Sequence, residues 1–309
     1  MPKNRLLRPK TLEDIDRRIE RVLRDLSDPE PPLDLRQVRE LLKLDRTFYT
    51  ADDPSLARTV ASRIRVGALQ VFKRPFLLVD IVRTLDVRGF YVPDQKRILI
   101  DESQPKPKHR WLEAHEVGHS LLPWHEDAMF GDSNHTLSPG CHDVIETEAN
   151  FAAGRMLFLR DRFTQEAEDH APSLDAVKTL KPTFGNTYTT TFWRCIETWG
   201  AERPIVGLIT QHPHPTKRKP DFDPTNPCRH FIQSRAFAER FSRLTEIALF
   251  EIVAKYCSPA RGGSLGQTEC ILTDDNGDQH RFYFETFNFH YDVLTLGLYL
   301  KPHQTLTRI

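Results

Sequence analysis

The amino-acid sequence predicts an α+β protein, and three observations about its apolar residues support that class. Several segments in the first two thirds of the chain repeat apolar residues at helical spacing. Two short β-rich runs, at residues 89–92 and 97–101, interrupt these segments. Near the C-terminus, apolar runs lie on both sides of Asn276-Gly277, a dipeptide typical of a two-residue hairpin turn.

The composition is that of a globular protein. The 309 residues are 39% hydrophobic and 28% charged, which argues against a disordered chain, a collagen or a coiled coil. The 43 basic and 43 acidic residues cancel, so the whole molecule has no general attraction for nucleic acid or anionic lipid. No apolar stretch approaches the roughly 18 residues needed to cross a bilayer. We therefore expect no membrane association and no direct binding of nucleic acid, which would need a local basic patch.

The cysteines and the N-terminus predict the cellular compartment. The first eight residues are basic and no apolar segment follows them, so they do not resemble a secretory signal. The five cysteines form no CxxC pair and are scattered along the chain, as is typical of buried thiols in a reducing compartment (Cys141, Cys195, Cys228, Cys257 and Cys270). Both features indicate a cytoplasmic protein.

Changes in composition divide the chain into five predicted parts. Proline-rich stretches mark two of the boundaries, one near residue 30 and one between residues 211 and 227. In order, the parts are a helical N-terminal extension, a central α+β domain, a short helical segment, a linker and a small β-rich domain (1–50, 51–165, 166–210, 211–227 and 228–309).

Helices dominate the first three parts. In the N-terminal extension, residues 11–26, with Thr11 as N-cap, and residues 35–44 form amphipathic helices that we expect to pack as a hairpin. Residues 244–256, in the β-rich domain, fit a helix and a strand equally well. Further helices are predicted in the central domain and in the helical segment (55–72, 77–85, 109–122, 143–160, 174–180 and 187–199).

The motif that carries chemistry is His115-Glu116-Val117-Gly118-His119. Two histidines four positions apart lie above each other on one face of a helix, so both imidazoles can bind one metal ion. Glu116 is then close enough to act on a water molecule at the metal. Roughly 0.03 such matches are expected by chance at this length and composition. Gly118 is a poor helix former, which indicates that another element packs closely against this face.

A zinc site needs a third protein ligand and one open position. The helix predicted over 143–160 offers Glu146 as the third ligand. Asn150 lies one turn later on the same face and is expected to orient a ligand imidazole. Glu148 projects from a different face, so we expect it to be a solvated surface carboxylate.

These motifs resemble those of the ImmA/IrrE-type zinc metallopeptidases. The runs AHEVGHSLLPWH (114–125) and ETEANFAAGRMLFL (146–159) are similar to the family patterns AHExGHxLLH and ExEANxFAxxLLMP. The resemblance covers residues 55–165, although Leu159 stands where the family usually has proline. It implies a zincin-like metallopeptidase core that binds one Zn²⁺ per chain. The implied zinc ligands are His115, His119 and Glu146, and the implied catalytic acid and base is Glu116.

A site of this kind predicts hydrolysis of a peptide bond. Zinc activates the attacking water, and Glu116 accepts its proton and passes it to the leaving amine. A second electrophile usually stabilises the oxyanion. The candidates for that role are His125, His135 and His142, in or near the loop between the two motif helices, and the residue pattern does not choose among them.

Three interpretations of function stay open. The first is a site-specific, regulatory endopeptidase, for which the resemblance implies a helix-turn-helix repressor as substrate. The second is a DNA- or partner-binding transcriptional regulator with a structural or vestigial zinc site, in which residues 173–199 form a helix-turn-helix. Arg194 is the only basic residue of its second helix, which favours packing between domains over phosphate contacts. The third is a sensor with a ligand among the aromatics of residues 282–289, although such alternation is more typical of a sheet core.

Overall fold

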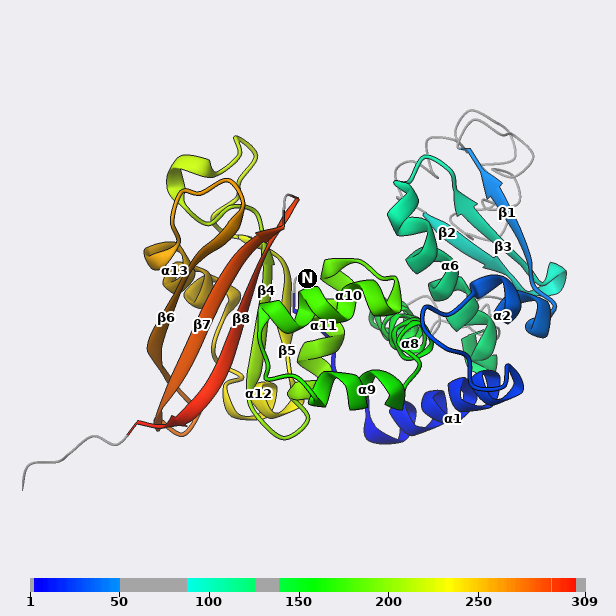
Figure 1. Cartoon of the computed structure of the whole chain (residues 1–309), viewed down its shortest axis with the longest axis horizontal. Coiled ribbons are helices and arrows are strands. Elements are labelled where there is room, and N and C mark those ends of the chain that lie inside the picture. The colour runs from blue at the N-terminus through cyan, green and yellow to red at the C-terminus, as the bar shows by residue number, and fades with distance from the viewer. Residues whose placement is uncertain (1–2, 51–87, 126–138, 290, 304–309) are drawn as a thin grey trace, which may run out of the picture. The chain divides into compact units, whose positions relative to one another are not determined.

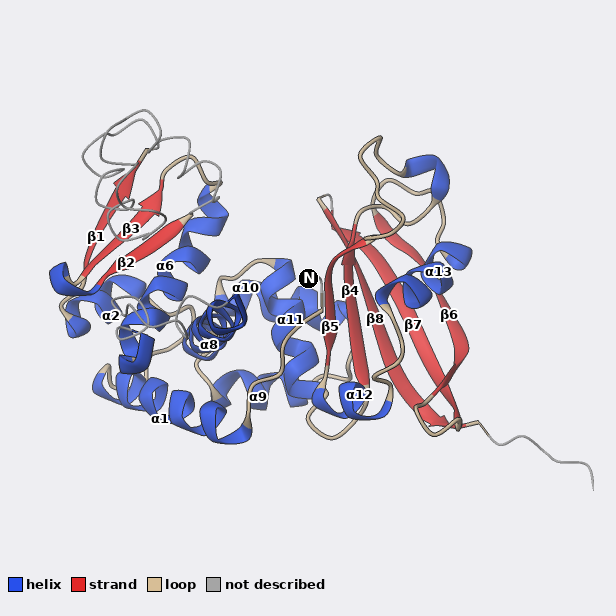
Figure 2. Ribbon diagram, turned by 180° about the vertical axis from the view of Figure 1, so that it is seen from behind, coloured by secondary structure: helices blue, strands red, loops and turns tan. Residues whose placement is uncertain are grey.

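The computed structural model shows two compact units, each built from helices and a sheet, which confirms the predicted α+β class (Figures 1 and 2). One unit is Leu7–Arg160, and the other combines Met1–Leu6 with Asp161–Ile309. Residues 7–50 of the predicted N-terminal extension thus share a unit with most of the central domain, and the predicted helical segment shares one with the β-rich domain. The structure describes four stretches of the chain (residues 3–50, 88–125, 139–289 and 291–303).

Two helices open the first unit, as predicted. Helix α1 (Pro9–Asp25) buries an apolar stripe that includes Ile15 and Ile19. The predicted cap at Thr11 is wrong, because the helix begins earlier, with a proline in its first turn, where the missing N–H is not needed. Helix α2 (Leu35–Leu42) is capped by the Asp34 side chain.

A strand that the residue pattern did not reveal joins the predicted extension to the central domain. Strand β1 (Asp45–Tyr49) pairs in parallel with β3 (Arg97–Asp101). Strand β2 (Gly89–Val92) pairs antiparallel with β3, so the sheet order is β1-β3-β2. Strands β2 and β3 are confirmed at their predicted positions. The helices predicted over 55–72 and 77–85 lie outside the described residues.

Two helices carry the sequence motifs. Helix α6 (Lys106–Leu121) packs on the sheet, and α8 (Pro139–Leu157) packs on α6. Helix α1 packs on α8, where Arg155 of α8 forms an ion pair with Asp16 of α1. The N-terminal helix therefore supports one of the two helices that carry the sequence motifs.

The second unit begins with α9 (Asp161–Glu168), α10 (Leu174–Phe184) and α11 (Tyr188–Trp199). An antiparallel sheet follows, with strand order β5-β4-β8-β7-β6. Its strands are β4 (Ile205–Thr210), β5 (Cys228–Gln233), β6 (Gly263–Thr273), β7 (Gln279–Phe289) and β8 (Asp292–Pro302).

Helices cover both faces of this sheet. Helices α12 (Arg235–Arg240) and α13 (Glu246–Tyr256) pack on one face, and α11 packs on the other (Figures 1 and 2). Residues 244–256, whose sequence fitted a helix and a strand equally well, therefore form a helix from Glu246 to Tyr256. Phe282 and Phe284 of β7 are fully buried under α12 and α13. These two aromatic residues are sheet core and do not line a ligand pocket.

The predicted hairpin at Asn276-Gly277 connects β6 to β7. Gly277 has φ of 90°, a conformation that glycine adopts without steric cost. The Asp274 carboxylate accepts hydrogen bonds from the backbone N–H groups of Asn276 and Asp278, which fixes the turn.

Helices α10 and α11 are packed within their own unit. Phe192 and Ile196 of α11 fill the space beside Gly207 of β4. Arg194 is 7% exposed and forms an ion pair with Glu197, so it is not presented to a phosphate backbone. The helix predicted over 174–180 extends to Phe184 and includes Pro182. These contacts support the packing interpretation of the pair over the helix-turn-helix interpretation.

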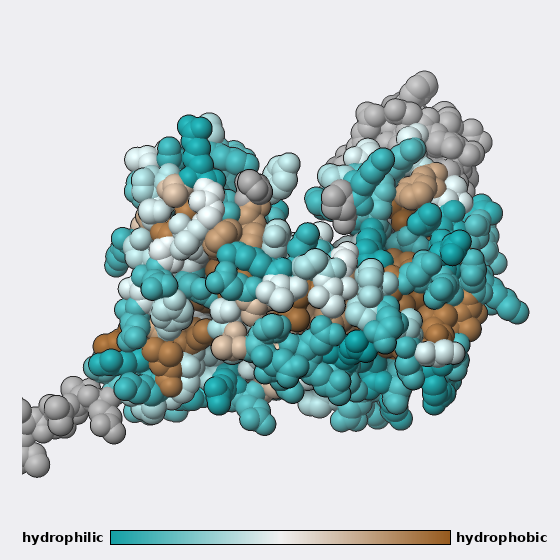
Figure 3. Space-filling model, in the orientation of Figure 1, coloured by the Kyte–Doolittle hydropathy of each residue, from teal (hydrophilic) through white to brown (hydrophobic). Residues whose placement is uncertain are grey.

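The surface visible in Figure 3 is mainly hydrophilic, and its apolar residues form separate patches. Large exposed apolar side chains of the described residues come from different elements, such as Leu41 of α2, Phe48 of β1 and Ile271 of β6. Scattered apolar residues of this kind are normal on a folded protein. In the described part of the chain, no helix has the length and apolar character to span a bilayer.

Candidate metal centre

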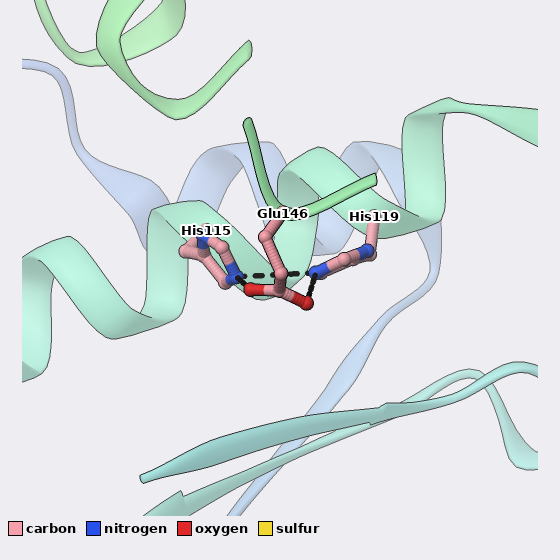
Figure 4. Close-up of side chains that lie close together, drawn as sticks. All are labelled: His115, His119 and Glu146. Carbon is pink, nitrogen blue, oxygen red and sulfur yellow. Dashed lines mark hydrogen bonds and ion pairs between the residues drawn. The ribbon is translucent and has the colours of Figure 1, made fainter. Parts of the chain in front are cut away.

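Three side chains gather where α6 packs against α8. His115 and His119 lie one turn apart on α6, Glu146 comes from α8, and their ligand atoms all lie within 4.8 Å of one another. The two Nε2 atoms are 3.1 Å apart. The Glu146 carboxylate lies 3.2 Å from His115 Nε2 and 3.6 Å from His119 Nε2. Figure 4 shows this carboxylate between the two imidazoles.

These separations suit a tetrahedral zinc ion. Two ligands held about 2.0–2.1 Å from such an ion lie about 3.3 Å from each other. Two imidazoles and a carboxylate are also a donor set that catalytic zinc sites use, with a fourth position left for water or substrate. The His119 side chain is 3% exposed and that of Glu146 is 40% exposed, so the cluster is accessible from the Glu146 side.

Gly118 allows the two helices to approach. A Cβ atom at this position would lie 2.8 Å from the backbone oxygen of Ala149 and 3.3 Å from the Cβ of Ala152. The close packing expected at Gly118 is therefore present, and small residues of α8 provide it. This approach lets a side chain of α8 reach the histidines of α6.

We expect Gly118→Ala to destabilise the protein, although alanine is the better helix former. Overpacking against backbone typically costs about 1–3 kcal/mol, which exceeds the gain of about 1 kcal/mol from helix propensity. Gly154→Ala in α8 is the matched control, because among the described residues no atom outside its own helix backbone lies within 4 Å of the added methyl group. The control should therefore be stabilising. Urea unfolding measures both changes, and equal stabilisation by the two would contradict the packing at Gly118.

Each ligand imidazole has a partner at its other nitrogen. His115 Nδ1 lies 3.0 Å from Oδ1 of Asn150, which is the contact expected of a residue that orients a ligand imidazole. His119 Nδ1 lies 2.9 Å from Nδ1 of His125. Burial lowers the pKa of His115, but the hydrogen bond to Glu146 and the nearby charge of Glu116 outweigh it and raise this pKa overall.

Glu148 and His125 occupy positions that differ from those predicted. Glu148 is 7% exposed, and its Oε2 accepts hydrogen bonds from Trp124 Nε1 at 2.6 Å and from His125 Nε2 at 2.9 Å. The prediction of a solvated carboxylate is wrong, because the segment after α6 turns back against α8 and covers this side chain. His125 is fully buried with both ring nitrogens bonded, which argues against its predicted role as an oxyanion stabiliser.

The side chains of the other two candidates for stabilising an oxyanion are not among the described parts of the structure. His135 lies outside the described residues. His142 belongs to α8, and its side chain lies outside the described part of the structure. A role for His142 therefore stays a prediction.

Glu116 is buried against the first sheet. Its side chain forms a hydrogen bond with the backbone of Tyr91 on β2. A Cβ atom at Gly89, at the start of β2, would lie 2.6 Å from Glu116 Oε1, so the absence of a side chain leaves room for the carboxyl group. Burial raises the pKa of Glu116 from 4.5 to about 7, although the charge of His115 and the Tyr91 contact oppose the shift. A carboxyl group that titrates near neutrality suits proton transfer in both directions.

We expect the metal-free protein to lose stability as the pH rises from 4.5 to about 7. In this range Glu116 releases its proton in the unfolded chain and keeps it in the folded chain, so rising pH favours unfolding. The contribution of this group is fully present below that range, is lost above it and is on the order of 3 kcal/mol. Glu116→Gln should remove this part of the slope in urea unfolding at a series of pH values. Coinciding slopes for variant and wild type would contradict the raised pKa.

The fold and the cluster define a protein with a candidate HExxH-type metal site on paired helices, to which the second helix contributes an acidic side chain. Residues 56–192 match the Peptidase_M78 family, described as the IrrE N-terminal-like domain. For this segment, the match confirms the resemblance to the ImmA/IrrE family that the motifs predicted. The matched segment contains His115, His119 and Glu146.

The fold also occurs among solved structures. A transcriptional regulator from Mycobacterium tuberculosis is similar, with a TM-score of 0.52 and 15% sequence identity. The match covers 93% of this chain and 76% of that chain. Likeness at this level of identity shows a shared fold. The search of curated proteins gave no match.

Proposed function

We propose that this protein is a zinc-dependent, site-specific endopeptidase with a regulatory role. The observation that carries the proposal is the cluster of His115, His119 and Glu146 beside the buried carboxyl group of Glu116. The cluster lies in a domain of a peptidase family, which supports hydrolysis over a purely structural metal site.

The residues of the chain have distinct roles in this proposal. His115 and His119 would hold zinc through Nε2, and Glu146 would hold it through its carboxylate. Zinc, when bound, supplies Lewis-acid chemistry that polarises a peptide carbonyl and activates water. Glu116 accepts a proton from the attacking water and delivers it to the leaving amine nitrogen. The contacts of Glu116 with β2 hold its carboxyl group in one orientation for both transfers.

A helix-turn-helix repressor is the proposed substrate, because the family resemblance implies one. The solved structure with a similar fold is described as a transcriptional regulator, which supports a regulatory role for this fold. The protein would act on such a substrate in the cytoplasm, as its scattered cysteines also suggest.

Cleavage of repressor proteins tests the proposal. The zinc-loaded protein is incubated with helix-turn-helix repressors from its own genome, and products are identified by mass spectrometry. We expect one repressor to be cut at one site, and no product with Glu116→Gln. Stoichiometric zinc without cleavage of any repressor would contradict the proposal and favour a regulator with a structural or vestigial zinc site.

A further inference from the structure

Two buried residues next to the proposed metal ligands, Glu148 and His125, have no role in the proposed chemistry. We propose that Glu148 is a positioning residue that acts through His125 to hold His119 in the tautomer that presents Nε2 to the metal. This inference rests on the proposed metal centre and concerns how the site is prepared for its ion.

The contacts form one chain of hydrogen bonds. Glu148 Oε2 lies 2.9 Å from His125 Nε2, and His125 Nδ1 lies 2.9 Å from His119 Nδ1. All three side chains are buried, and that of His125 is fully so. Water therefore does not compete for these bonds, and each group depends on the next for its partner.

With a neutral His125, the chain of bonds permits one arrangement of protons. An ionised carboxylate only accepts hydrogen bonds, so His125 donates to Glu148 from Nε2 and accepts at Nδ1. His119 must then donate from its own Nδ1, which leaves the Nε2 lone pair free for a metal ion. The opposite tautomer of His119 would place two lone pairs face to face across 2.9 Å.

Trp124 holds the carboxylate in place. Its Nε1–H group donates to the same Glu148 oxygen at 2.6 Å. The guanidinium of Arg18, on α1, lies 5.2 Å from the centre of the indole ring, and it also donates to the backbone oxygen of Leu121 at 3.4 Å. The acceptor at the end of the chain is thus fixed by contacts that do not require a metal.

The two ligand histidines are held by different kinds of partner. Asn150, which contacts His115, is an exposed neutral amide, whereas His125, which contacts His119, is bonded in turn to the buried carboxylate of Glu148. Hydrogen bonds to an ionised acceptor are roughly twice as strong as bonds between neutral groups. Loss of Glu148 should therefore weaken zinc binding more than loss of Asn150 does.

Zinc affinity of the full-length protein, measured by competition with a chromophoric chelator, gives the first test. Glu148→Ala and His125→Phe should each weaken binding by about 10- to 100-fold, the range typical of outer partners of metal ligands. Glu148→Gln keeps the size of the side chain and an acceptor oxygen, so it should fold like wild type and lose less affinity. Wild-type affinity in all three variants would overturn the proposal.

A double-mutant cycle separates positioning from packing. His125→Asn keeps an oxygen near the Nδ1 position as an acceptor for His119, but it breaks the link to Glu148. Glu148→Ala should therefore weaken zinc binding in the wild-type background and leave it unchanged in the His125→Asn background. Equal losses in both backgrounds would indicate a structural role only and would overturn the proposal.

Nitrogen-15 NMR of the histidine side chains reads the tautomer without activity or metal. We expect His119 to carry its proton on Nδ1 in the wild type and on a mixture of both nitrogens in Glu148→Ala. Glu113→Gln is the matched control. It changes another buried carboxylate, bonded to Arg39 and Arg46, and should affect stability without changing zinc affinity or the His119 tautomer.

The outcomes distinguish this inference from the proposed function. A wild-type protein that binds no zinc would remove the proposed function and this inference with it. Tight zinc binding in the wild type, together with unchanged affinity and an unchanged tautomer in the Glu148 variants, would overturn the positioning role alone.

Discussion

Glu116→Gln should keep its bound zinc and lose about 10²- to 10⁴-fold in the rate of peptide cleavage. The amide has almost the size of the carboxyl group, but it cannot accept a proton from water near neutral pH. His115, His119 and Glu146 remain in place, so zinc content measured by plasma mass spectrometry should equal that of the wild type. The loss of activity should therefore appear in the cleavage rate and not in the zinc content.

Glu113→Gln is the matched control for that experiment. Glu113 is a buried carboxylate on the same helix, but it pairs with Arg39 of α2 and Arg46 of β1, away from the cluster. Its replacement should lower stability and leave the cleavage rate of the folded protein unchanged. Cleavage by Glu116→Gln at the wild-type rate would show that another group transfers the proton.

His115→Ala and Glu146→Ala should abolish tight binding of one zinc ion per chain. Each removes one of three protein donors, so the loss should exceed the about 10- to 100-fold that follows removal of an outer partner. Chelator competition measures it. Thr147→Ala is the control on α8, since its hydroxyl donates to the backbone oxygen of Asp143 in the same helix. Unchanged affinity in Glu146→Ala would show that a different group completes the site.

The centre of the site was predictable because its signal is local. The spacing of His115 and His119 fixes their common face on any helix, and the second motif places Glu146 and Asn150 one turn apart. Burial of Glu148 was not predictable from helix geometry, because it depends on where the segment after Leu122 turns. Gly89 was missed for a similar reason, since its importance lies in the space that Glu116 needs from a distant element.

The difference between local signals and contacts with distant elements also explains which parts of the fold could be predicted from the sequence. The Asn276-Gly277 turn and most helices carry local signals, and they were found. Strand β1 was missed because its partner β3 lies far downstream. Strand β4 was also missed. It lies between β5 and β8 and all its residues are buried, so its sequence lacks the alternation of apolar and polar residues that marks a strand with one solvated face.

The parallel pairing of β1 with β3 bears on how the protein can be divided. A fragment trimmed to residues 56–192 would leave out α1 and β1, exposing apolar side chains of α8 and an edge of β3. It would also end within α11 and lack the sheet against which that helix packs. The boundaries of sequence similarity are therefore not those of an autonomous folding module, and a shortened protein would need residues on both sides of them.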